Sequence, residues 1–185
     1  MVDIRHRADG RSRRADILAA AEREFGNLGW AGGRVERIAA DARVNKQLLF
    51  HYFESKAGLF TAALESLLGR FEPQGPSGTP VEELRRVIRT VESAARTVPG
   101  ILFQSPRHAG DDLPAAGSGA LEMWRERQRA RLASAVADGQ RRGHFRDDLD
   151  PATVAGVGLA FALGCGALGE AVGAAAWMLD YCAWR

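Results

Sequence analysis

The spacing of apolar residues constrains this chain more than any other feature. In residues 12–28 they recur at helical intervals and form one stripe: Ile17, Leu18, Ala21, Phe25 and Leu28. Gly29 then supplies a helix stop. No stretch of the sequence alternates apolar and polar residues with period two, which is the pattern of a half-buried strand. We therefore predict an all-α fold.

Three further helical patterns follow in the N-terminal part, at 34–41, 45–53 and 55–70. Asn45 and Ser55 are suited to cap the second and third of these. The segment EPQGPSGTP, residues 72–80, contains three prolines and two glycines and cannot continue a helix. We therefore expect a basic flexible arm at 1–11, a helical domain at 12–70 that ends in a connecting helix, and a second helical domain at 80–185.

The second domain shows four helical stretches. One begins at Val81, a charged one runs over 121–142 after a loop-like stretch at 105–119, and the last covers 174–184. The uncharged stretch 152–169 is long enough to be considered as a membrane-spanning helix. Five glycines dilute it and acidic residues flank it, so we interpret it as a buried helix that begins at Asp150-Pro151.

Net charge is only +2, but its distribution is uneven. Residues 1–70 hold 12 Lys/Arg against 9 Asp/Glu, and five arginines lie within the first 14 residues. Such an arm suits a polyanion, although it could equally be a solvated tail. Cys165 and Cys182 lack metal-ligand or CxxC spacing, so we expect reduced thiols in a cytoplasmic protein, with no metal and no cofactor.

The two short helices at 34–41 and 45–53, joined by a tight turn and preceded by a longer helix, form the pattern of a helix-turn-helix. In that arrangement the second helix enters the major groove of DNA, which is about 12 Å wide. Its inward residues would be Leu48, Leu49 and Phe53, which leaves Lys46, Gln47 and His51 outward. Tyr52 would either point outward with them or pack in support of Phe53. Gln can bond adenine, Lys can reach guanine or phosphate, and His and Tyr can donate to phosphate oxygens.

The segments ILAAAEREFGNLGW and VERIAADARVNKQLLFHYFESKAGLF, with RRGHFRDDLDPATVA later in the chain, resemble the tetracycline-repressor (TetR) family. The resemblance implies an all-α homodimer that binds double-stranded DNA at a palindromic operator. It further implies a transcriptional regulator, usually a repressor, that a small-molecule effector releases from DNA by entering the C-terminal ligand-binding and dimerisation domain.

Carried over position by position, the resemblance makes Lys46 and Gln47 base readers. It places four further residues near phosphates or the groove edge: Asn45, Phe50, His51 and Lys56. Arg43 stands in place of the usual turn glycine, where a positive φ would cost about 1–3 kcal/mol and a phosphate contact could offset it. Gly33 replaces a common capping Thr, so one cap bond is expected to be missing.

Aromatic and Met residues of the second domain are candidates for an effector pocket or for plain core: Phe103, Met123, Trp124, Phe161 and Trp177. The helix at 152–169 has two apolar faces, so we expect one to pack on its own domain and the other on a second subunit. The candidate dimer contacts are Val154, Val157, Phe161, Gly164 and Leu168.

Two alternatives of other classes remain. One is a ligand-independent DNA-binding or architectural protein without an inducer pocket. The other is an α-helical enzyme or partner-binding bundle, but the sequence contains no Gly-rich phosphate loop, no GxSxG and no HExxH, and its four histidines are scattered. We therefore expect a protein that is not an enzyme.

Overall fold

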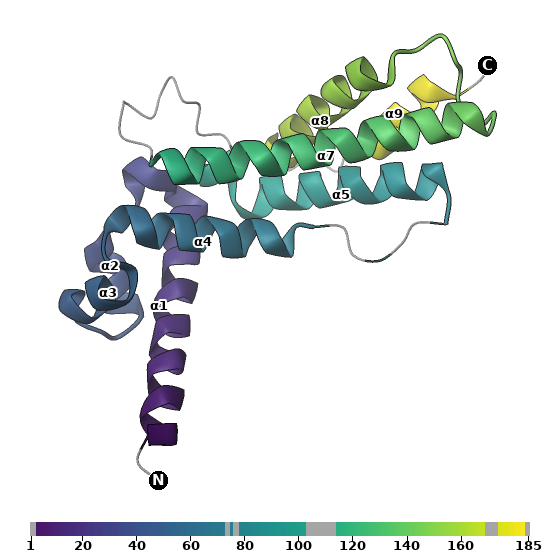
Figure 1. Ribbon diagram of the computed structural model, residues 1–185. Helices are drawn as coiled ribbons and strands as arrows, with labels where there is room; N and C mark the ends of the chain where they lie inside the picture. The colour runs from purple at the N-terminus through teal and green to yellow at the C-terminus, as the bar shows by residue number, and fades with distance from the viewer. Residues whose placement is uncertain (1–2, 73–74, 76–77, 103–113, 169–173, 184–185) are drawn as a thin grey trace. The chain divides into compact units, whose positions relative to one another are not determined.

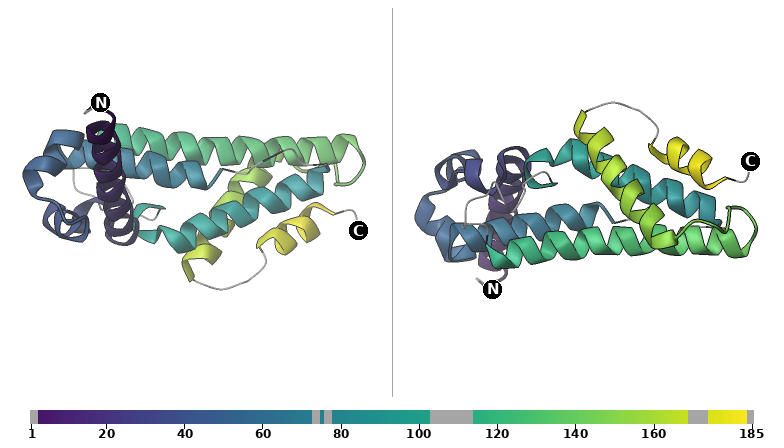
Figure 2. Two further views of the ribbon diagram at one scale, coloured as in Figure 1. Left: turned by 90° about the horizontal axis from the view of Figure 1, so that it is seen from below. Right: turned by 90° about the horizontal axis from the view of Figure 1, so that it is seen from above.

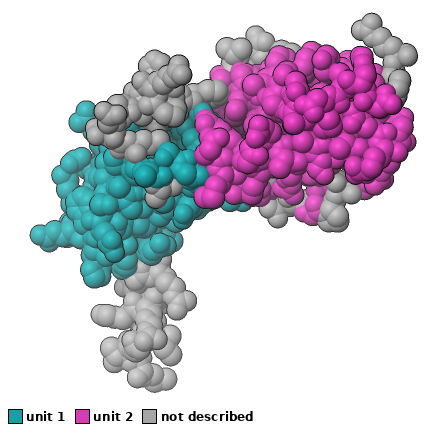
Figure 3. All heavy atoms as spheres, turned by 45° about the horizontal axis from the view of Figure 1, so that its top comes forward, with its two compact units in different colours: residues 1–70, 98–121 teal, residues 71–97, 122–185 magenta. Residues whose placement is uncertain are grey.

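A computed structural model describes residues 3–72, 75, 78–102, 114–168 and 174–183, with side chains from Ser12 onward except at Ala116 and Leu168. In these residues the chain forms nine helices and no strand (Figure 1), which confirms the all-α prediction. The chain divides into two compact units (Figure 3). The first comprises residues 1–70 and 98–121, and the second comprises residues 71–97 and 122–185.

The first unit is built around α1 (Asp3–Gly32), which contacts α2 (Val35–Asp41), α3 (Lys46–Phe53), α4 (Lys56–Arg70) and the short α6 (Pro99–Leu102). At the centre of its core, the rings of Phe25 and Phe60 meet edge to face at 5.0 Å. Regular helix is interrupted at Gly29, whose φ of 65° suits glycine, as the sequence predicted.

Two expectations for this unit were wrong. Residues 3–11, expected as a flexible arm, form the first turns of α1; they contain no proline and several good helix formers. The helix α6 was not expected at all. It packs closely on α1, as the position of Gly100 shows: a Cβ there would lie 2.6 Å from the backbone of Asn27.

The second unit contains α5 (Pro80–Thr97), the larger part of α7 (Ala115–Arg141), α8 (Pro151–Leu168) and α9 (Ala174–Cys182). Here α5, α8 and α9 pack against one another, as both views in Figure 2 show. Thr79 and Glu82 cap α5 reciprocally, and the Asp150 carboxylate accepts the backbone N–H of Thr153 at 2.8 Å to cap α8. None of the described helices could span a membrane.

The start of α7 corrects the predicted loop at 105–119. The helix begins at Ala115 and includes Gly117 and Gly119, which the sequence pattern places in that loop. At Gly117 the missing side chain serves packing, because a Cβ there would lie 2.9 Å from the ring of Phe60. The last helix ends at Cys182, slightly before the predicted end.

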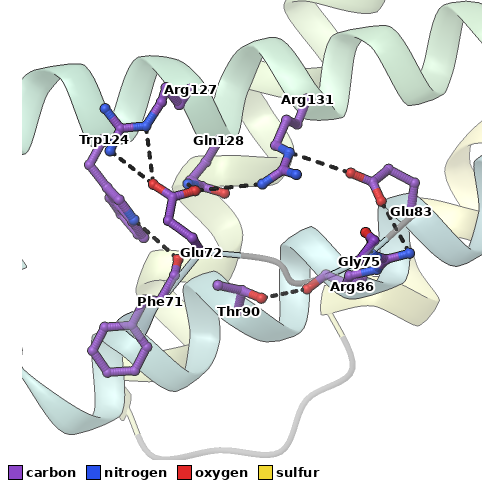
Figure 4. A network of polar contacts seen from close by, with 10 residues as sticks. All are labelled: Phe71, Glu72, Gly75, Glu83, Arg86, Thr90, Trp124, Arg127, Gln128 and Arg131. Carbon is purple, nitrogen blue, oxygen red and sulfur yellow. Dashed lines mark hydrogen bonds and ion pairs between the residues drawn. The ribbon is translucent and has the colours of Figure 1, made fainter. Parts of the chain in front are cut away.

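A network of polar contacts fixes the segment that follows α4 onto α7 (Figure 4). The Trp124 indole N–H donates to the Phe71 carbonyl at 3.2 Å. The carboxylate of Glu72 accepts from Arg127 at 2.8 Å and from the amide of Gln128 at 3.3 Å. The two residues that leave α4 are therefore held by side chains of the second unit.

Candidate nucleic-acid interface

The angle between α2 and α3 is set by apolar side chains that the sequence places inward. Ile38 of α2 and Leu49 of α3 are completely buried, and Phe53 is almost so. Both short helices also contact α1. Neither helix could be stable alone at seven or eight residues, so this packing on α1 holds the pair together.

The turn between these helices contains a left-handed residue and a capped helix start. Arg43 adopts a φ of 55°, a left-handed conformation that costs a non-glycine residue about 1–3 kcal/mol. The next residue, Val44, returns its backbone N–H to the carbonyl of Ala39 at 2.9 Å. Asn45 then caps α3 by accepting the N–H of Leu48 at 2.8 Å. The left-handed turn thus reverses the chain and aims the start of α3 away from the core.

The outward side of α3 carries the residue types that read DNA. Lys46, Gln47 and His51 are exposed, and Phe50 is 38% exposed. Tyr52 is half-buried, with its ring 5.4 Å from that of His51 in an edge-on arrangement. These side chains share one short helix, which a major groove can admit.

Lys56 is positioned differently from the other candidates. Its side chain is half-buried, and its Nζ donates to the Trp30 carbonyl at 2.9 Å and lies 4.3 Å from the centre of the Trp30 ring. Burial, followed by repulsion from Arg34, lowers the pKa of this ammonium. Lys56 therefore joins α4 to the end of α1, and its predicted phosphate contact would have to be made from this anchored position.

Gly33 also has a structural role that the sequence did not indicate. A Cβ at this position would lie 2.4 Å from the ring of Phe25, so a larger residue would collide with the core. The N-cap residue of α2 is Arg34 and not Gly33, where the missing cap was expected, and the Arg34 side chain makes no capping hydrogen bond. Its backbone N–H instead donates to the Glu24 carboxylate at 3.0 Å.

This surface carries one further charged residue that the sequence pattern does not indicate. Glu36, in the first turn of α2, pairs with the ammonium of Lys46. The two residues are ten positions apart in the chain and lie on different helices, so only the fold brings them together. That hydrogen bond is the main reason why the pKa of Glu36 is lowered.

Comparison with known proteins identifies this arrangement. Residues 17–63 match the model of the family described as bacterial regulatory proteins, tetR family. The HTH-type transcriptional repressor SCO4008 of Streptomyces coelicolor is 31% identical over 141 residues, which cover 75% of this chain and 70% of that protein. The chain belongs to the TetR family. Its helix-turn-helix is accordingly the DNA-binding part of a transcriptional regulator.

Further comparisons agree with this TetR-family assignment. The HTH-type transcriptional repressor NicS of Pseudomonas putida is 28% identical over 142 residues, covering 74% of this chain and 67% of NicS. The crystal structure of AibR in complex with isovaleryl coenzyme A and operator DNA superposes with a TM-score of 0.71 over 92% of this chain and 97% of AibR. At 22% identity, AibR is similar in fold.

The candidate effector residues differ in exposure. Met123 is 60% exposed, whereas its neighbour Trp124 is completely buried. Phe161 and Trp177 lie together, ring centres 4.9 Å apart, on the side of α8 and α9 that is partly exposed. Phe103 lies outside the described residues. Adjacent residues of one helix point about 100° apart, and Met123 and Trp124 accordingly lie on different sides of α7.

The second unit does carry a groove of about 300 Å³, along the start of α5 and the end of α7. Its lining is largely polar and includes Thr79, Glu83 and Arg131, and it includes none of the aromatic candidates. Among the described residues, no three His, Cys, Asp or Glu side chains come close enough to hold a metal ion.

The candidate dimer residues of α8 fall on two sides of the helix. Val154 is buried within its own unit, so its prediction as a subunit contact is wrong; Val154 shares the inner face with Ala155 and Ala162. Val157 is 50% exposed, Phe161 is half-buried and Gly164 is exposed. The side chain of Leu168 lies outside those that the structure describes.

Proposed function

We propose that this regulator is a cytoplasmic homodimeric repressor that inserts α3 of each subunit into successive major grooves of a palindromic operator and leaves DNA when a small-molecule effector binds. The observation that carries the proposal is the exposed row of Lys46, Gln47 and His51 on a capped helix whose opposite side is buried. A two-fold dimer would place these helices about 34–36 Å apart.

The outer side of α8 and α9 supports a dimer. Val157 is 50% exposed, Trp177 38% and Tyr181 48%. The Trp177 ring stacks on that of Tyr181 at 5.4 Å and contacts Phe161, so the aromatic residues form one continuous apolar surface. Gly164 adds a point of close approach, because the space beside it is open. A second copy of this surface, related by two-fold symmetry, would cover it.

A buried polar group supports an effector site in the second unit. Gln128 is completely buried on α7, and its Nε2 donates to Glu72. Its Oε1 has no hydrogen-bond partner within the described part of the chain. Such an acceptor costs about 1–3 kcal/mol, which a ligand N–H or O–H group would recover. Because Gln128 also contacts Glu72, just after α4, this ligand contact would act on the connection to the DNA-binding unit.

Two measurements test the proposed function. Footprinting with the purified protein on the DNA upstream of its own gene should protect a palindrome, and sedimentation should give a dimer at micromolar concentration. A protein that sediments as a monomer and binds a palindrome without cooperativity would contradict the dimer. Specific binding that no candidate small molecule weakens would favour the ligand-independent regulator instead.

A further inference from the structure

The ion pair between Glu36 and Lys46 lies on the outward side of the helix-turn-helix. The ammonium of Lys46, the first residue of α3, donates to the Glu36 carboxylate, and the two side chains are 51% and 62% exposed. Two other cations lie nearby, since both Arg34 and Lys56 belong to the same electrostatic cluster as Glu36. A carboxylate therefore stands within the positive surface that faces DNA in the proposed function.

Folding gives little reason for this pair. An ion pair with both members more than half exposed contributes little to stability, because water and salt screen it. A carboxylate at a DNA-binding surface also repels phosphates and withdraws one cation from them. A carboxylate in the first turn also stabilises the N-terminus of α2, but that effect does not require a partner on α3, so the pairing with Lys46 points to recognition.

Base chemistry supplies such a reason. In the major groove, a guanine offers two acceptors at O6 and N7, whereas its cytosine partner offers a donor at the N4 amino group. Lysine suits the first and a carboxylate suits the second. A Lys and a Glu held side by side thus match a G·C pair, or two neighbouring pairs, because Lys is a hydrogen-bond donor and Glu an acceptor.

Building on the proposed function, we propose that Glu36 of α2 is a specificity-determining residue that holds the Lys46 ammonium in the free protein and accepts a hydrogen bond from a cytosine N4 amino group in the operator. On the operator, Lys46 donates to guanine, and the cytosine N4 amino group replaces it as the donor to Glu36. On other sequences, Glu36 faces acceptors or phosphates, and the repulsion weakens binding. Both helices of the helix-turn-helix then read bases.

The test begins with the full-length protein and random duplex DNA. Wild-type protein first selects a palindrome. The affinities of wild type and of Glu36→Gln for this palindrome and for a scrambled duplex are then measured across a salt series. Glu36→Gln should bind the scrambled duplex more tightly, with a salt dependence steeper by about one released ion, because Lys46 becomes free to contact a phosphate. The ratio of specific to non-specific affinity should fall about tenfold or more. The sequences that this variant selects should no longer share a fixed cytosine at one position of each half-site.

Glu65→Gln is the matched control, since Glu65 is an exposed carboxylate on α4 of the same unit and the charge change is identical. It should leave the selected sequence and the affinity ratio unchanged. In a Lys46→Gln background, Glu36→Gln should no longer steepen the salt dependence. Thermal melting of each variant checks that folding is intact.

The outcomes separate this inference from the function on which it rests. If wild-type protein selects no sequence, the proposed function itself fails. If it selects a palindrome but Glu36→Gln and Glu65→Gln give the same ratio and the same selected bases, Glu36 is a surface residue and only this inference is overturned.

Discussion

The indole N–H of Trp124 donates a hydrogen bond to the backbone carbonyl of Phe71, with 3.2 Å between nitrogen and oxygen (Figure 4). Trp124 is completely buried on α7, and Phe71 is the first residue after α4. Carbonyls at the end of a helix have no partner within the helix. This indole therefore supplies a donor to the carbonyl of the first residue after α4 and joins that residue to α7 within the second unit.

Trp124→Phe should lower the free energy of unfolding by about 1–3 kcal/mol. The substitution removes the donor to the Phe71 carbonyl and leaves part of the indole volume empty. Urea denaturation followed by circular dichroism measures the change. Met123→Leu is the control, because Met123 is 60% exposed and the swap should cost less than about 0.5 kcal/mol. Equal stability of both variants would mean that the hydrogen bond contributes nothing.

Gln47→Ala should weaken operator binding by about 1–3 kcal/mol and relax base preference at one position of each half-site. The exposed Gln47 amide has the paired donor and acceptor that adenine requires. Electrophoretic mobility shifts on the operator and on single-base variants give the result. Binding to scrambled DNA should stay unchanged. An unaltered preference at every position would remove Gln47 from the reading surface.

Lys56→Met should weaken binding to all DNA sequences alike and reduce the salt slope by about 1, if the ammonium contacts a phosphate from its place beside Trp30. Met keeps an aliphatic chain on the Trp30 ring, so the loss of stability should stay within about 1 kcal/mol. Filter binding at several salt concentrations decides the matter. Lower stability together with an unchanged salt slope would make Lys56 purely a structural residue.

Gly164→Arg should convert the dimer to folded monomers. A Cβ at Gly164 has open space around it within the protomer, so the arginine does not disturb the fold and acts only on a subunit across the surface. Gly119→Arg is the matched control, since Gly119 is exposed on α7 with equally open space. Sedimentation velocity of both variants is the measurement. A Gly164→Arg protein that remains dimeric would place the interface elsewhere.

Asp150→Ala should lower the melting temperature by about 2–4 °C through loss of the α8 cap. The hydroxyl and the backbone N–H of Thr153 hold the pKa of Asp150 below its ordinary value. Its stabilisation is therefore complete above the pKa of the unfolded state and is lost as the pH falls through the lower, folded pKa. Asp150→Asn keeps a cap and should remove this part of the pH dependence. Melting curves from neutral to acidic pH compare the three proteins.

Local features of the first unit could be predicted because the decisive contacts are close in sequence. Asn45 caps α3 through Leu48, three residues on, and Ser55 accepts the N–H of Gly58 at 3.0 Å in the same way. The six inward residues of α4 follow from helical period alone: Leu59, Phe60, Ala63, Leu64, Leu67 and Leu68. The exposed row on α3 is what remains once the buried positions are assigned.

Contacts between distant segments could not be predicted in this way. Periodicity gave no reason to place Trp124 inside and Met123 outside, because the partner of Trp124 is a backbone carbonyl 53 residues earlier. Gly117 looked like a loop residue, and only the Phe60 ring beside it explains a glycine within a helix. Likewise, only the angle between α2 and α3 brings Glu36 to Lys46.

The sequence by itself determined eight of the nine helices described, most of their ends and the exposed polar side chains of α3. These depend on backbone capping and on a 3.6-residue period, which act over a few residues. Tertiary structure decided which apolar side chains are core, where Lys56 is anchored and which carboxylate pairs with Lys46. Those outcomes depend on which surfaces of separate helices meet, and the pattern within any one helix does not contain that information.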